Sequence, residues 1–146
     1  MNKTQFPRRH RNFIYGSLGL LALSGLCWLV SNYAIEGHEG WGDVALNTQF
    51  WALKFHGAGM MLFLLALGSS FSHIAAGMQE RRNKAMGIAL LVIFGLMIMS
   101  GWLIYYGPSG DSRDWISIAH WSFGLLACAA FVAHILTGRK KTRRRR

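Results

Sequence analysis

Four histidines lie inside long apolar stretches of the sequence, and they are the residues best suited to chemistry: His56, His73, His120 and His134. An imidazole surrounded by lipid is costly, so a histidine in a membrane-spanning segment indicates a functional site. His120 and His134 lie fourteen residues apart, which is two heptads, so both face one seam of a left-handed bundle. At about 1.5 Å per residue they are roughly 21 Å apart along the helix. This spacing suits one haem in each leaflet of a membrane.

His56 and His73 lie seventeen residues apart, three more than the other pair. On a straight helix this separation turns the two side chains about 100° apart. On heptad spacing both reach one seam, along the row His56, Gly59, Phe63, Ala66, Ser70 and His73. The three extra residues add roughly 4.5 Å, so the sequence predicts a tilt or a local bulge in this segment.

A matching row runs through the last apolar segment and joins His120, Gly124, Ala127, Phe131 and His134. Gly59 and Gly124 follow the first histidine of each row by about one helical turn. Because glycine has no side chain, we expect these two residues to leave room for a flat macrocycle beside each ligand.

Four predicted membrane-spanning helices must position these histidines. With 52% hydrophobic and 15% charged residues, the chain has the composition of a polytopic membrane protein. The sequence predicts an all-α, transmembrane four-helix bundle over residues 13–138, with spans at 13–33, 50–78, 84–106 and 115–138. Residues 1–12 and 139–146 are expected to be basic tails. A cleaved signal peptide is the rival interpretation of the first span, disfavoured because the apolar run is long and no small-x-small site follows.

The charges are distributed in a way that orients a membrane protein and argues against binding to nucleic acid. The net charge is +10, but fourteen of the sixteen Lys and Arg residues lie in the two tails or in the turn between the second and third spans. Five of the six acidic residues lie in the two opposite loops. The positive-inside rule therefore predicts that both termini are cytoplasmic.

The two halves of the sequence resemble each other, which favours a duplicated helical hairpin. A Ser-Gly pair near the end of the first span recurs near the end of the third, and a Trp precedes both His56 and His120 by five residues. If the two hairpins have the same orientation, the second and fourth spans are parallel. His56 and His120 then share the outer leaflet, and His73 and His134 share the inner one.

This pairing by leaflet favours haem over other interpretations of the histidines. Haem iron takes one axial nitrogen from each side, and two facing helices can supply both. A zinc site fits less well, because its ligands converge on one point. A further alternative is that the histidines line the helices and bond to Ser, Thr or backbone groups. The sequence has no C-x-x-C-H, so covalent attachment of haem is not expected.

Other polar residues are assigned supporting roles or none. Candidates to hydrogen-bond the ligands are Ser72, Ser117 and Thr137, for which ordinary backbone bonding is the alternative. Candidate cations for the haem propionates are Lys54, Arg113, Arg81, Arg82 and Arg139, for which headgroup contact is the favoured interpretation. His10 and His38 lie outside the predicted spans and are expected to be solvated.

The chain resembles the small four-helix di-haem membrane cytochromes b of bacteria over roughly residues 13–138. The resemblance rests on the four-span pattern, on His56 and His73, and on the run HWSFGLLACAAFVAHILTG. In size and histidine layout the chain is most similar to the flavinylation-associated cytochrome group, and more distantly similar to the cytochrome b subunits of hydrogenases and formate dehydrogenases. The resemblance implies two non-covalent b-type haems and a multi-pass protein of the bacterial inner membrane. It also implies electron transfer between a quinol or membrane dehydrogenase and a redox partner, which can be an exported flavoprotein.

Two histidines on one iron leave no open coordination position, so the expected role is one-electron transfer by a carrier subunit rather than catalysis by a stand-alone enzyme. A quinone pocket and an aromatic belt are both compatible with Trp41, Tyr105, Tyr106 and Trp115. A catalytic quinol oxidoreductase is a third interpretation. The alternative from another class is a haem-free four-helix transporter or anchor that uses the histidines as a proton relay, but the predicted spans contain no acidic residue.

Overall fold

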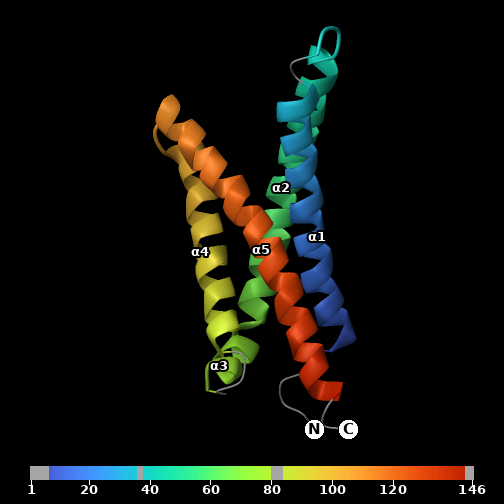
Figure 1. Cartoon of the computed structure of the whole chain (residues 1–146), viewed down its shortest axis with the longest axis vertical. Helices are drawn as coiled ribbons and strands as arrows, with labels where there is room; N and C mark the ends of the chain where they lie inside the picture. The colour runs from blue at the N-terminus through green and yellow to red at the C-terminus, as the bar shows by residue number, and fades with distance from the viewer. Residues whose placement is uncertain (1–6, 36–37, 80–83, 144–146) are drawn as a thin grey trace. The chain divides into compact units, whose positions relative to one another are not determined.

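The structure is a computed structural model that describes residues 7–35, 38–79 and 84–143, with side chains for 7–35, 38–76 and 84–136 (Figure 1). The helices in chain order are α1 (Arg8–Val30), the π-helix η1 (Ser31–Ile35), α2 (Gly42–Ser69), α3 (Phe71–Gln79), α4 (Lys84–Tyr106) and α5 (Asp111–Arg143). No strand occurs within these ranges, so the predicted all-α fold is confirmed.

Four helices are long and apolar enough to cross a membrane, as the sequence predicts. They cover Arg8–Ile35, Gly42–Ser69, Lys84–Tyr106 and Asp111–Leu136, each with 23 to 28 residues. A bilayer core of about 30 Å needs roughly 20 apolar helical residues, so every one of these helices can span it. The length and composition of the helices therefore fit a multi-pass membrane protein.

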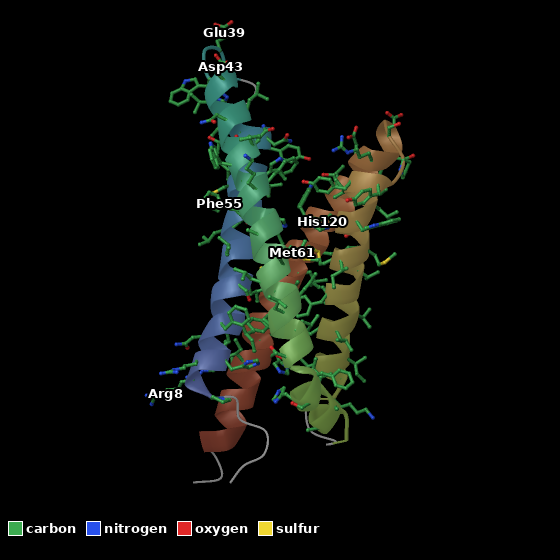
Figure 2. All side chains as sticks on the ribbon, turned by 180° about the vertical axis from the view of Figure 1, so that it is seen from behind. Arg8, Glu39, Asp43, Phe55, Met61 and His120 are labelled. Carbon is green, nitrogen blue, oxygen red and sulfur yellow. The ribbon has the colours of Figure 1, made fainter. Side chains whose placement is uncertain are left out.

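These helices form the two predicted hairpins, in which α1 packs against α2 and α4 packs against α5 (Figure 1). The chain divides into two compact units at His73, and the two hairpins fall in different units. We call α1, η1 and α2 hairpin 1, and α4 and α5 hairpin 2. Figure 2 shows Arg8 at one end of hairpin 1 and the acidic residues Glu39 and Asp43 at the other. The ends of this hairpin thus carry opposite charges.

Small side chains hold hairpin 1 together. The buried residues of α1 and η1 are three serines at seven-residue spacing, Ser17, Ser24 and Ser31. Those of α2 include a second heptad series of Ala45, Ala52, Gly59 and Ala66. Small residues let two helix backbones approach closely in a membrane, where no hydrophobic force drives the helices together. The predicted seam of α2 is confirmed at Gly59 and Ala66, and also at Phe63 and Ser70, which are both buried.

The connections between the helices are shorter than the sequence predicts. The spans predicted at 13–33 and 50–78 leave residues 34–49 as a loop, but α2 already begins at Gly42. Residues 107–114 were expected to form a turn, but α5 begins at Asp111. In both places an acidic residue lies in the first turn, Asp43 in α2 and Asp111 in α5. A carboxylate there stabilises the positive end of the helix dipole, which explains the early starts.

The second span, predicted over residues 50–78 with a tilt or a local bulge, is divided between two helices, α2 and α3. The chain turns at Ser70, with φ −90° and ψ 2°, between α2 and α3. The hydroxyls of Ser69 and Ser70 both donate to the carbonyl of Ala66, at 2.9 and 2.6 Å. Serines that bond the preceding turn compete with the backbone ladder and bend helices. The irregularity lies between His56 and His73, where the seventeen-residue spacing predicts one.

Candidate functional site

His56 projects from α2 onto the backbone of α1. Its Nδ1 atom lies 3.1 Å from the carbonyl oxygen of Leu21 and 3.1 Å from Oγ of Ser24. A carbonyl oxygen can only accept a hydrogen bond, so Nδ1 carries the ring proton. In a neutral imidazole the other nitrogen, Nε2, then bears the lone pair. The contact with α1 therefore selects the tautomer in which Nε2 is the nitrogen able to bind a metal.

Ser24 has no proton to give to His56. Its hydroxyl donates to the carbonyl of Leu20 at 2.6 Å, one helical turn earlier, and lies 3.1 Å from the carbonyl of Leu21. A hydroxyl has one proton and two acceptor lone pairs, so Oγ accepts from Nδ1 of His56 while the proton is held by the backbone. The result is a short chain of hydrogen bonds that runs from the imidazole through Ser24 into the carbonyls of α1.

His120 repeats this arrangement in hairpin 2. Its Nδ1 atom lies 2.8 Å from Oγ of Ser100. The Ser100 hydroxyl donates to the carbonyl of Leu96 at 2.7 Å and lies 3.2 Å from that of Met97. By the same reasoning Nδ1 of His120 is the donor, and Nε2 bears the lone pair. Two histidines in two separate hairpins are thus held in one tautomer by one kind of contact.

The glycine after each serine makes room for the histidine ring. A Cβ atom built on Gly25 would lie 3.4 Å from Cε1 of His56, and one built on Gly101 would lie 3.3 Å from Cε1 of His120. A Cβ atom at these distances would already touch the ring, so a side chain longer than that of alanine would push the imidazole away from its serine. We call this Ser-Gly pair the Ser-Gly cradle. Its serine accepts a hydrogen bond from the ring N–H, and its glycine leaves space for the edge of the ring.

Gly59 and Gly124, expected to leave room for a macrocycle, each pack against the partner helix of their own hairpin. A Cβ atom on Gly59 would lie 3.3 Å from the backbone nitrogen of Leu21, and one on Gly124 would lie 3.3 Å from Cε of Met97. Their missing side chains let the helices approach beside the cradles. Their role toward a macrocycle remains a prediction.

The other two predicted ligands are half-buried. His73 lies on α3, three residues beyond the turn at Ser70, and His134 lies on α5 with a buried Nδ1 atom. The first half of the sequence therefore supplies one histidine on α2 and one on α3, whereas the second half supplies two on α5. Within the described part of the chain, no three or more His, Cys, Asp or Glu residues group together as a metal site would require. A haem takes only two axial ligands, and these need not come from such a group.

Sequence reasoning missed Ser24 and Ser100 and proposed other hydroxyls as partners of the ligands. Ser72 is exposed and Ser117 is half-buried, and neither is recorded with a hydrogen bond to a histidine in the described residues. The side chain of Thr137 lies outside those residues. The signal that finds the two serines is the repeat itself, because a Ser-Gly pair and a histidine recur together in both halves of the sequence.

The cations expected near haem propionates are placed differently from one another. Nζ of Lys54 lies 4.1 Å from the ring centre of Phe50 and 5.0 Å from that of Trp51, which holds the ammonium group against two aromatic faces. Nε of Arg113 donates to the carbonyl of Ile104 at 3.2 Å. The side chains of Arg81, Arg82 and Arg139 lie outside the described residues.

The two histidines expected to be solvated differ from each other. His38 is exposed, as expected. His10 is half-buried on the first turn of α1, with Nε2 3.3 Å from Oγ of Ser70, so the prediction for His10 is wrong. The helix begins at Arg8 rather than at residue 13, and this earlier start carries His10 onto the face that meets α2.

Comparison of the chain with protein-family models, with curated proteins and with solved structures finds no match in any of the three.

Proposed function

We propose that this chain is a transmembrane electron carrier that binds two b-type haems through paired histidines. The observation that carries the proposal is the duplicated Ser-Gly cradle, in which Nδ1 of His56 lies 3.1 Å from Oγ of Ser24 and Nδ1 of His120 lies 2.8 Å from Oγ of Ser100. Histidines that bind metals nearly always donate their other ring N–H to a protein acceptor, which fixes the tautomer and raises the basicity of the ligand. These histidine donors therefore fit the haem that the resemblance to di-haem cytochromes b implies.

In this proposal each haem takes one histidine from each half of the sequence. His56 and His120 hold the iron of the outer haem, and His73 and His134 hold that of the inner haem. Haem supplies one-electron redox chemistry, and two axial histidines leave no position for oxygen or substrate. The protein orients the imidazoles, keeps the haems in an apolar medium and sets their potentials through hydrogen bonds to the ligands.

The charges support an orientation with both termini on the cytoplasmic side of a bacterial inner membrane. Basic residues such as Arg8, Arg9 and Arg11 begin hairpin 1, whereas Glu39 and Asp43 lie at its far end (Figure 2). Positive residues are retained in the cytoplasm during insertion. Electrons would then pass between a quinol or membrane dehydrogenase and a redox partner, for which an exported flavoprotein is the proposed type.

The direct test is the absorbance spectrum and haem content of the protein purified from haem-replete cells. We expect reduced-minus-oxidised bands of six-coordinate b-type haem and two haems per chain. A matched control is His38→Ala, which changes an exposed histidine outside the four spans and should keep both haems. A colourless protein that is folded and monodisperse would contradict the proposal and favour the haem-free transporter or anchor.

A further inference from the structure

His10 and Ser70 form a third histidine–serine pair, at the opposite end of hairpin 1 from its exposed acidic residues. Nε2 of His10 lies 3.3 Å from Oγ of Ser70. The Ser70 hydroxyl is buried and donates its proton to the carbonyl of Ala66 at 2.6 Å. Oγ of Ser70 therefore accepts from Nε2 of His10, so this imidazole carries a proton on Nε2.

His10 differs from the proposed ligands in which ring nitrogen makes the hydrogen bond. At His56 the hydrogen bonds hold the proton on Nδ1 and leave the lone pair on Nε2. At His10 the bond to Ser70 holds a proton on Nε2, the nitrogen that would otherwise bind a metal. The geometry thus gives His10 the role of a hydrogen-bond donor rather than that of an axial ligand.

The position of this pair follows the heptad register of hairpin 1. His10 and Ser24 lie fourteen residues apart on α1, and His56 and Ser70 lie fourteen residues apart along α2 and its end. The His56–Ser24 and His10–Ser70 contacts are therefore two heptads apart along both helices of this antiparallel pair. In α5 the same fourteen-residue step leads from His120 to His134. Ser70 thus occupies, relative to His56, the position that His134 occupies relative to His120.

Ser70 is also the residue at which α2 ends and the chain turns into α3. His73 follows on the first turn of α3, so the path of the chain at Ser70 determines where the His73 imidazole lies. The backbone N–H of Ser70 bonds the carbonyl of Leu67, and the Ser70 hydroxyl donates to the carbonyl of Ala66 instead. The hydrogen bond from His10 helps to hold the Ser70 hydroxyl in this position.

We infer that His10 and Ser70 are positioning residues for His73, the proposed inner ligand on this half of the chain. The inference rests on the proposed function, because it assigns His73 to a haem. On this inference the break between α2 and α3 belongs to the inner site. His73 lies three residues further from His56 than His134 lies from His120, and the His10–Ser70 contact fixes the turn that accommodates these three residues.

The test measures the electron paramagnetic resonance signal and the midpoint potential of each ferric haem in the purified protein. The inner haem is identified first, as the signal that His73→Ala and His134→Ala both remove. His10→Ala and Ser70→Ala should each shift this signal and change the inner ferric-to-ferrous ratio at fixed potential about threefold or more. The double variant should shift it no further than either single variant, because both remove one contact.

Two further variants separate positioning from general destabilisation. His10→Gln keeps an N–H near the place of Nε2 and should restore most of the native inner signal. Ser69→Ala is the matched control, because Ser69 donates to the same Ala66 carbonyl and no contact with His10 is recorded for it. Ser69→Ala removes a hydrogen bond to this carbonyl but not the contact with His10, so it should shift the inner signal less than Ser70→Ala does and leave the outer haem unchanged. The outer-haem signal reports folding in every variant.

Three outcomes would overturn the inference while leaving the two-haem proposal intact. The first is an unchanged inner signal in His10→Ala and Ser70→Ala. The second is an equal shift of both haems, which would indicate general loosening. The third is a haem signal that both His10→Ala and His134→Ala remove and His73→Ala does not, which would make His10 the ligand. Absence of haem from the unmodified protein would instead contradict the proposed function itself.

Discussion

In hairpin 1 the buried side chains of the first helix are serines, whereas in hairpin 2 they are Leu90 and Phe94. The second helices differ as well, since α2 buries a heptad series of small residues and α5 buries Ala127 alone within the described side chains. The two interfaces therefore use different packing chemistry. Yet each holds a histidine by Nδ1 on a serine and admits its ring edge beside a glycine.

This difference separates what packing requires from what the histidines require. A small-residue interface like that of hairpin 1 is sufficient to join two membrane helices. In hairpin 2 the large residues Leu90 and Phe94 are buried on α4 in place of the serines that are buried on α1. Because the Ser-Gly cradle occurs in both settings, helix packing does not account for it. Orientation of the imidazole accounts for it in both hairpins, which is why we give the cradles a functional role.

The largest expected effect comes from filling the cradles. Gly25→Leu and Gly101→Leu each place a side chain where the imidazole lies, since even a Cβ atom would be 3.4 or 3.3 Å from Cε1 of the histidine. Under the proposed function, each change should displace its ring and remove the outer haem, leaving about one haem per chain by absorbance. Gly19→Leu is the control, because a Cβ atom there meets nothing within 4 Å. Retention of two haems in both cradle variants would show that the rings are not held there.

The next effect concerns the glycines that bring the helices together. In Gly59→Ala the new Cβ would lie 3.3 Å from the backbone nitrogen of Leu21, which cannot move aside, so we expect a loss of about 1–3 kcal/mol in stability. In Gly124→Ala the nearest atom is the flexible end of Met97, so the loss should be smaller. Thermal unfolding in detergent checks the order, and a larger loss for Gly124→Ala would contradict this account of the two interfaces.

If the proposed function holds, the smallest effect is on the redox potential of the outer haem. Ser100→Ala removes a 2.8 Å bond to Nδ1 of His120, which should lower the basicity of the imidazole and raise the potential. Ser24→Ala leaves the carbonyl of Leu21 as an acceptor for His56, so its shift should be smaller and in the same direction. Potentiometric titration of both variants checks this, with Ser69→Ala as control. A larger rise in Ser24→Ala would contradict the hydrogen-bond assignment.

Much of the fold could be predicted because long apolar runs and charge patterns act along the chain itself. The four spans and the irregularity between His56 and His73 followed from hydropathy and from residue spacing. The helix starts at Arg8 and Gly42 were missed, because a helix that extends past the apolar run is stabilised by its ends and by its neighbour rather than by hydropathy.

The candidate site was predicted only in part. The histidines could be found because an imidazole in an apolar helix is unusual. Ser24 and Ser100 were missed, because a serine in a helix usually bonds its own backbone, and here each does so while also accepting from a histidine of another helix. His10 was missed because its contact with Ser70 depends on the register of two helices distant in sequence.

Haem stoichiometry in histidine variants tests most directly whether the two hairpins share one haem through their cradled histidines. The account predicts about one haem per chain in His56→Ala, about one in His120→Ala and, because both remove the same group, about one in the double variant. The remaining haem should have the same spectrum in all three. A double variant that loses both haems, after single variants that each retain a different one, would contradict the shared site.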